Sequence, residues 1–198
     1  MDKERFQKQL NFLCEIDKVK QVIRNTILMD RSRRENDAEH SWHMAVCAML
    51  FTEYVNDPNI DMAKVLKMIM LHDTIEIYSG DTFAYDTVGK ETQSEREQEA
   101  AEKLFSLLPK DQKCEFHLLW REFEEMQTSE AKYARLVDSF MPLYHNYMTE
   151  GQRWKEFGVR KSQVLKRANY IRMGSEVIWE YACDLINESV DKGYLQDD

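Results

Sequence analysis

The chain has 198 residues, a length that suits one domain, and its 43% hydrophobic and 32% charged residues are typical of a globular protein. It contains only six Gly and three Pro, and this scarcity favours long helices because a β-rich fold needs many turns. The net charge of −9 argues against a large interface with a nucleic-acid polymer, whereas a pocket with a metal or a local cation can still bind a small phosphorylated substrate.

The cysteines and the N-terminus indicate the compartment. Cys14, Cys47, Cys114 and Cys183 form no C-x-x-C pair, which favours reduced, packed thiols over a disulfide or zinc framework. The first residues lack the apolar run of a signal peptide, and no apolar stretch reaches the length of a membrane span. We therefore expect a cytoplasmic helical protein that does not associate with membranes.

The first part of the chain is predicted to form two helices and a loop. Apolar residues at helical spacing predict a first helix over Lys3–Glu15 and a second, short helix over Asp17–Leu28. Residues 30–37 are polar and predict a loop. Asn36 and Asp37, at the end of this loop, are both suited to cap the helix that follows.

The central helices are more apolar. The helix expected over Ala38–Val55 is apolar over most of its girth, which is typical of a helix in the middle of a bundle. Met62–Leu71 is similar and runs into His72-Asp73, with Gly80 suited to end it. After a mobile loop to about Thr92, further helices are expected over Ser94–Leu107, Gln112–Met126, Ser129–Tyr147 and Val159–Lys192. The prediction is an all-α bundle, one domain over residues 1–198 with its core in 6–147 and a long C-terminal helix in 159–192.

His72 and Asp73 are the clearest local sign of a functional site. Burying an ionised Asp73 beside His72 in an apolar helix is costly unless the charge is neutralised, and a divalent cation does so directly. Glu76 lies near the same helix face as Asp73 because it is three residues further on. A hydrogen-bonded His–Asp pair at a helix end explains the dipeptide alone equally well.

Two other ionisable residues occupy apolar surroundings. His40 opens the apolar helix at Ala38, and Asp138 lies in the apolar stretch LVDSF of a later helix. Three helices thus each bring a candidate ligand to the interior, as in many metal-binding bundles. Two imidazoles and two carboxylates suit one divalent ion, with Mn, Co, Fe, Ni, Zn and Mg all open.

The order of these residues resembles a known signature. His40 … His72-Asp73 … Asp138 is similar to the H…HD…D pattern of the HD-superfamily metal-dependent phosphohydrolases, over roughly residues 6–147. Within that superfamily, E-H-S at Glu39, H-D-x-x-E-x-x-x-G-D at His72 and the upstream Arg24-Asn25 are most similar to the bacterial 5′-deoxynucleotidases. The resemblance implies an HD domain, a homodimer, metal ligands at His40, His72, Asp73 and Asp138, and catalytic acids at Glu76 and Asp81.

These implied roles agree with the chemistry of phosphate-ester hydrolysis. A bound cation lowers the pKa of its water toward neutrality and stabilises charge on a phosphoryl oxygen. Glu76 can orient or deprotonate that water, and Asp81 can assist it or protonate the leaving oxygen. The sequence leaves the division of roles open. As alternatives, Glu76 is a solvated helix residue and Asp81 an ordinary turn residue.

The substrate-binding segment departs from the family pattern. In the deoxynucleotidases an Arg-Trp pair before the Arg-Asn dipeptide contacts phosphate and sugar, whereas here residues 17–25 contain no Trp and no Arg before Arg24. Lys can supply charge but not a bidentate fork. The loop between Asn25 and His40 is longer than in those relatives and adds Arg31, Arg33 and Arg34, which can meet a phosphate or form a solvated basic loop. The candidate phosphate-binding residues are Lys18, Lys20, Arg24 and Arg34.

Four functions fit the sequence. The first is a 5′-nucleotidase that releases phosphate from (deoxy)nucleoside 5′-monophosphates. A nucleotide pyrophosphohydrolase or triphosphohydrolase keeps the fold and changes the bond cleaved. A two-iron oxygenase needs more ligands, and only His43 is spare. A metal-stabilised interaction module needs no catalysis. In a homodimer, Trp179 and Tyr181 of the last helix are candidate contacts.

Overall fold

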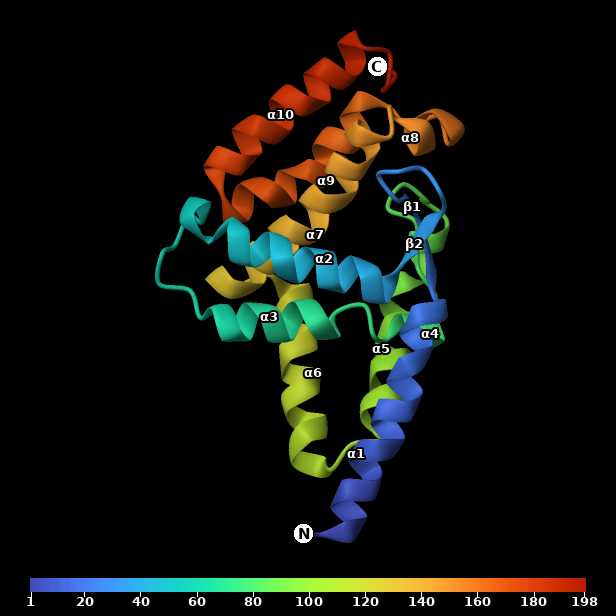
Figure 1. The fold of residues 1–198 in the computed structure, drawn as a ribbon, viewed down its shortest axis with the longest axis vertical. Coiled ribbons are helices and arrows are strands. Elements are labelled where there is room, and N and C mark those ends of the chain that lie inside the picture. The colour runs from blue at the N-terminus through green and yellow to red at the C-terminus, as the bar shows by residue number, and fades with distance from the viewer.

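A computed structural model describes all 198 residues and shows a mostly helical fold, as the sequence predicts (Figure 1). One short antiparallel strand pair is added to the helices. None of the helices is long and apolar enough to span a membrane. The elements are α1 (Lys3–Ile16), the 3₁₀ turn η1 (Asp17–Gln21), β1 (Ile23–Ile27), β2 (Arg34–Asn36), α2 (Asp37–Leu50), η2 (Thr52–Tyr54), α3 (Met62–Leu71), α4 (Glu76–Ser79), η3 (Gly89–Glu91), α5 (Gln93–Phe105), α6 (Lys110–Glu125), α7 (Ser129–Met148), α8 (Gln152–Glu156), α9 (Lys161–Gly174) and α10 (Glu176–Asp191).

The predicted second helix is wrong. Residues 17–21 form a 3₁₀ turn, and the chain then extends into β1, which pairs with β2. The β-branched residues Ile23, Thr26 and Ile27 favour this extended conformation. Arg24 and Ile27 of β1 are buried. The strand pair thereby holds an arginine in the interior, beside the start of α2.

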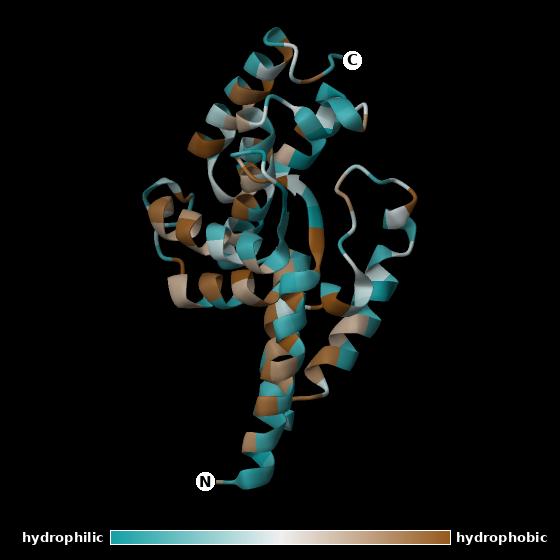
Figure 2. Cartoon of the chain, turned by 45° about the vertical axis from the view of Figure 1, so that its right-hand side comes forward, coloured by the Kyte–Doolittle hydropathy of each residue, from teal (hydrophilic) through white to brown (hydrophobic).

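Helix α7 forms the centre of the main hydrophobic core. It packs most extensively on α9 and also contacts α2, α3 and α6. Met44, Ile69, Leu136 and Ile171, one from each of α2, α3, α7 and α9, are fully buried there. A second, smaller cluster lies between α1, α5 and α6. Apolar and polar residues alternate along these helices in bands, the pattern of amphipathic helices with one buried face (Figure 2).

The predicted long C-terminal helix is also wrong, because it is divided into α9 and α10. Ser175 between them is extended, with φ −158° and ψ 119°, and its hydroxyl accepts a hydrogen bond from the Ile178 amide to cap α10. Just before this break α9 crosses α7 very closely. A Cβ atom on Gly174 would lie 2.9 Å from Leu136, so only glycine permits this approach.

Candidate metal centre and active site

The start of α2 is fixed by its cap, which places His40 in the first helical turn. The Asn36 side chain accepts a hydrogen bond from the Glu39 amide (3.0 Å), and the Glu39 carboxylate accepts one from the Asn36 amide (3.1 Å). This is a complete capping box. Of the two residues suited to cap this helix, Asn36 does so. Asp37 is instead fully buried and faces the site.

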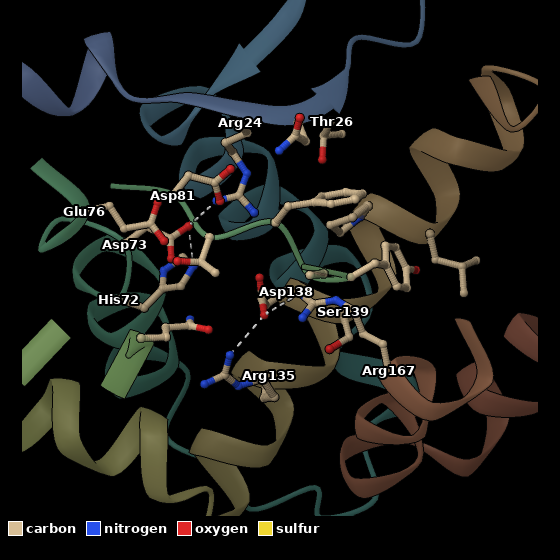
Figure 3. A pocket seen from close by; sticks show the side chains of 18 of the residues that line it. Arg24, Thr26, His72, Asp73, Glu76, Asp81, Arg135, Asp138, Ser139 and Arg167 are labelled. Atoms are coloured by element: carbon tan, nitrogen blue, oxygen red, sulfur yellow. Dashed lines mark hydrogen bonds and ion pairs between the residues drawn. The ribbon is translucent and has the colours of Figure 1, made fainter. Parts of the chain in front are cut away.

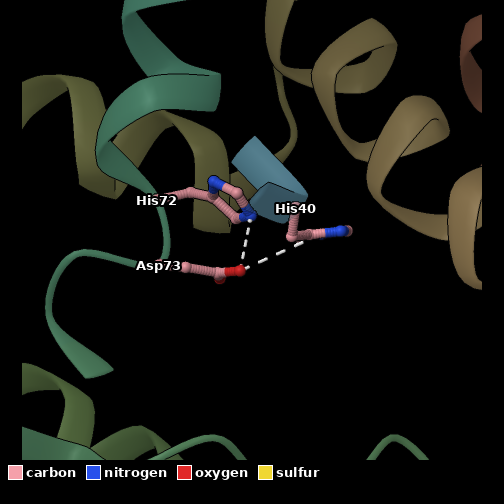
Figure 4. Close-up of side chains that lie close together, drawn as sticks. All are labelled: His40, His72 and Asp73. Carbon is pink, nitrogen blue, oxygen red and sulfur yellow. Dashed lines mark ion pairs between the residues drawn. The ribbon is translucent and has the colours of Figure 1, made fainter. Parts of the chain in front are cut away.

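Four predicted ligands from three segments of the chain converge in the interior. His72 Nε2 lies 3.0 Å from Asp73 Oδ2, and His40 Nε2 lies 3.9 Å from the same oxygen (Figure 4). Asp138 Oδ1 lies 3.3 Å from His40 Nε2. Ligands that each lie about 2.1 Å from one ion are separated by roughly 3–4 Å, so the spacings of His40, His72 and Asp73 suit a single shared cation, and Asp138 lies beside this group next to His40.

The orientation of both imidazoles also fits a metal. His72 Nδ1 lies 2.7 Å from the Ile69 carbonyl oxygen, and because a carbonyl only accepts, Nδ1 carries the proton. The buried Nε2 of His72 therefore presents a lone pair to the Asp73 carboxylate, with no hydrogen-bond donor between them. His40 Nδ1 faces Glu35 Oε1 at 3.5 Å, which likewise turns its Nε2 inward.

Two acceptors that face each other need a proton or a cation between them. Burial disfavours the charged imidazole of His72, but the neighbouring Asp73 outweighs burial and raises the pKa of His72. His72 and Asp73 thus attract positive charge to the point where a metal ion would bind. A divalent ion there would be held by His40, His72, Asp73 and Asp138, a nitrogen and oxygen set that suits Mn, Fe, Co, Ni or Zn.

Asp138 is buried in the middle of α7 and uses its two oxygens differently. Oδ1 faces His40, while Oδ2 accepts from Arg135 Nη1 at 3.2 Å and from Arg167 Nη2 at 3.4 Å (Figure 3). Burial alone would raise the pKa of Asp138, but Arg167, His40 and Arg135 lower it well below its usual range. The carboxylate is therefore ionised and available as a ligand.

Arg24 is surrounded by three carboxylates. Its Nη1 donates to Asp73 Oδ2 (2.6 Å) and to Asp37 Oδ1 (3.2 Å), and its Nε lies 3.3 Å from Glu35 Oε1. Burial and the adjacent Asp73 raise the pKa of Asp37 to about 7, against the opposing influence of Arg24. Burial also opposes ionisation of Asp73, but His72 and Arg24 lower its pKa below the usual range. Arg24 therefore neutralises the acidic side of the site.

Replacing Arg24 tests this network. Arg24→Met leaves Glu35, Asp37 and Asp73 buried without their shared cation, so we expect the free energy of unfolding to fall by about 3–5 kcal/mol. Denaturant unfolding at neutral pH measures this loss. Lys18→Met is the matched control, because Lys18 is exposed and pairs only with Glu15. Equal stability of the two variants would contradict the network.

Glu76 and Asp81 lie on the same side of the site as Arg24 (Figure 3). Burial raises the pKa of Glu76 well above its usual range, and Asp73 and Asp37 add to the rise. The helix predicted to run from Met62 to Gly80 is divided, because α3 ends at Leu71; Gly80 instead ends the short α4, with φ 74°, and the turn directs Asp81 into the pocket. Burial also raises the pKa of Asp81, while Arg24 opposes the rise. Two carboxyls with raised pKa values beside the predicted metal centre are suited to proton transfer.

The predicted phosphate-binding residues other than Arg24 lie outside the pocket. Lys18 pairs with Glu15 at 2.6 Å, Lys20 pairs with Asp17, and Arg34 is exposed on β2. The 3₁₀ turn, in place of the expected helix, turns Lys18 and Lys20 toward solvent, and β2 does the same for Arg34. His43 lies 3.4 Å from His145 and does not line the pocket.

The pocket itself is lined by four arginines, of which only Arg24 was predicted. Arg135 of α7, Arg153 of α8 and Arg167 of α9 supply the others. Glu35 and Asp37 beside the ligands were also missed. Arg135 lies three residues before Asp138, and this spacing on one helix face was an available signal. The sequence contains no comparable signal for Arg153 and Arg167, because only the packing of α8 and α9 brings them to the site.

Comparison with known proteins supports this arrangement. Residues 16–179 match the HD domain family. A crystal structure of a predicted metal-dependent phosphohydrolase from Magnetospirillum magnetotacticum is 45% identical, covers 97% of this chain and 96% of that one, and has a TM-score of 0.93.

Curated relatives share part of the chain. The human 5′-deoxynucleotidase HDDC2 is 31% identical over 130 residues, which are 65% of this chain and 62% of the human protein. The 5′-deoxynucleotidase hdd1 of Schizosaccharomyces pombe is 33% identical over 110 residues, 54% of each chain. The chain thus spans somewhat less than two thirds of the length of these relatives. From the motif, the site geometry and these matches, the chain belongs to the HD-domain family of metal-dependent phosphohydrolases and is related to its 5′-deoxynucleotidase members.

Proposed function

We propose that this protein is a divalent-metal-dependent 5′-nucleotidase that releases inorganic phosphate from nucleoside 5′-monophosphates, deoxynucleotides among them. The convergence of His40, His72, Asp73 and Asp138 beside two buried acids is the observation that supports hydrolysis. The relation to 5′-deoxynucleotidases supports a nucleoside monophosphate as the substrate. The arginines in the pocket are suited to the phosphate dianion.

The residues of the chain divide the reaction between them. When bound, the metal supplies a water of lowered pKa and positive charge near the phosphoryl oxygens. Glu76 is suited to hold the proton of the attacking water, because its carboxyl is buried and its pKa is raised. Asp81 is suited to donate a proton to the leaving 5′-oxygen, since it lies at the pocket wall with a raised pKa. Arg24 keeps Asp73 ionised as a ligand.

The structure also contains an observation relevant to longer substrates. Arg135 and Arg167 line both this pocket and an adjoining one, which is lined in part by Lys90 and Lys166. Such a continuation has room for further phosphate groups. A nucleotide pyrophosphohydrolase or triphosphohydrolase is therefore the second candidate function.

A substrate panel separates these functions. Purified protein is first stripped with chelator and then assayed with added Mn²⁺ or Co²⁺ on nucleoside mono-, di- and triphosphates, ribo and deoxy. We expect metal-dependent release of inorganic phosphate from monophosphates, abolished by the chelator. Release of pyrophosphate or tripolyphosphate from the longer nucleotides would favour the second function. No turnover of any nucleotide with any metal would contradict both.

A further inference from the structure

The four guanidinium groups of the pocket differ in the number of hydrogen bonds and ion pairs that they form with the rest of the protein. Arg24 contacts three carboxylates. Arg135 donates to Asp138 and to Glu124 (2.9 Å), and its guanidinium lies over the Phe123 ring at 4.1 Å. Arg153 donates to Asn25 Oδ1 (2.6 Å), pairs with Glu156, and lies over the Phe157 ring. These three guanidiniums are held by the fold.

Arg167 is the exception. Its single polar contact is the 3.4 Å hydrogen bond from Nη2 to Asp138, which is the longest of the contacts from these arginines to carboxylates. The Nε atoms of all four arginines are buried without a hydrogen-bond partner, so the difference lies in the terminal nitrogens, of which Arg167 uses only one. The Arg167 side chain is 23% exposed, whereas those of Arg24, Arg135 and Arg153 are 10%, 16% and 11% exposed. Arg167 is thus both the least occupied and the most accessible guanidinium in the pocket.

The position of Arg167 suits a ligand held at the metal centre. It contacts Asp138, a candidate metal ligand, and lies close enough to Asp81 to oppose the rise in pKa that burial imposes on that carboxyl. Figure 3 shows it across the pocket from Arg24 and Asp81. An anion between Asp81 and Arg167 would therefore lie beside the predicted metal position.

Positive charge is concentrated around Arg167. Burial lowers the pKa of Lys90, and the neighbouring Arg167 and Lys166 lower it further. Repulsion between these cations is relieved when an anion binds among them. Lys90 and Lys166 thus add to the positive potential at Arg167, which favours an anion there.

We propose that Arg167 of α9 is the phosphate-binding arginine of this site, and that its free guanidinium donors hold the non-bridging oxygens of the substrate's phosphoryl group. This inference rests on the proposed phosphohydrolase function. It assigns phosphate recognition to a helix that carries none of the metal ligands. A planar guanidinium with several free N–H donors matches the geometry of a phosphate.

Binding of inorganic phosphate tests this role independently of turnover. We would titrate inorganic phosphate by calorimetry into Mn²⁺-loaded wild type, Arg167→Met, Arg167→Lys and the control Arg172→Met. Arg172 is on the same helix but is exposed and paired with Glu176. Loss of a charge-assisted hydrogen bond predicts phosphate binding about 10- to 100-fold weaker in Arg167→Met. Arg167→Lys should restore it in part, and Arg172→Met should match wild type.

Mn²⁺ affinity, measured in the same four proteins, distinguishes two roles of Arg167: binding the substrate phosphate, or holding Asp138 in place as a metal ligand. We expect it to stay within about threefold of wild type in Arg167→Met, with KM for the nucleotide raised more than kcat is lowered. Unchanged phosphate binding, or a loss of Mn²⁺ affinity as large as the loss of phosphate affinity, would overturn the assignment. If wild type binds phosphate through Arg167 but hydrolyses no nucleotide, this inference stands and the proposed function fails.

Discussion

Asp138→Ala is expected to lose its divalent metal and its phosphohydrolase activity together, and to unfold at a lower temperature. The substitution removes a predicted ligand and leaves the buried His40 and the half-buried Arg135 and Arg167 without the carboxylate that they share. Removing one partner from a buried charged network costs about 3–5 kcal/mol, which for a domain of this size lowers Tm by roughly 6–20 °C. Metal analysis, phosphate release and thermal unfolding measure the three effects.

Asp184→Ala is the matched control for this prediction. Asp184 is an exposed aspartate on α10, so its replacement should leave metal content, activity and Tm unchanged. A chelator added to wild type should reproduce the loss of activity and part of the loss in Tm, because metal binding stabilises the folded state. Full metal content in Asp138→Ala would show that the centre lies elsewhere.

Glu76→Gln is expected to retain the metal and the fold while kcat falls by roughly 10²- to 10⁴-fold. Glu76 is buried, and glutamine matches its carboxyl in size and shape, so the substitution preserves the packing and removes the group that takes up the proton. An amide cannot exchange a proton with the attacking water. Steady-state kinetics on a nucleoside monophosphate, with metal content and Tm measured on the same sample, test this separation.

Glu97→Gln provides the comparison within the same pocket. Glu97 lies on α5, and burial raises its pKa also, but its carboxylate accepts a hydrogen bond from Gln93 and does not lie among the residues around the predicted metal position. We expect its kcat to stay near that of wild type. Equal losses in the two variants would indicate a general effect of carboxylates in the pocket, and unchanged turnover in Glu76→Gln would remove Glu76 from the mechanism.

Sequence reasoning predicted the central helices because their apolar periodicity reflects burial in this fold. It also singled out His40, His72, Asp73 and Asp138, which the structure brings together. Each is an ionisable residue in an apolar stretch, where burial without a partner is costly. Each of these four residues can therefore be identified as a candidate ligand from its own sequence context, without knowledge of its tertiary contacts.

The errors lie where the structure depends on partners distant in the chain. β1 pairs with β2 seven residues later, and its buried Arg24 is stabilised by Glu35, Asp37 and Asp73. The spacing of apolar residues within residues 17–28 contains no information about this strand pairing and predicts a helix instead. Lys18 and Lys20 precede Arg24 in the chain, but the 3₁₀ turn directs them outward, where they pair with Glu15 and Asp17.

The break at Ser175 was missed because the amphipathic pattern continues across it. A serine that caps α10 through its hydroxyl interrupts the helix without any Pro to mark the point. Arg153 and Arg167 were missed for a related reason. They follow the HD motif by many residues, and only the packing of α8 and α9 brings them to the pocket.

The close crossing at Gly174 sets the distance between α7 and α9, and this distance determines where the Arg167 guanidinium lies. Because Leu136 of α7 and Gly174 of α9 are nearly in contact, the gap between these helices is set at its minimum there. Arg167, two turns earlier on α9, extends from that fixed point toward Asp138, two residues beyond Leu136. A larger residue at 174 would push α9 away from α7 and move the Arg167 guanidinium away from Asp138, although residue 174 itself contacts no ligand.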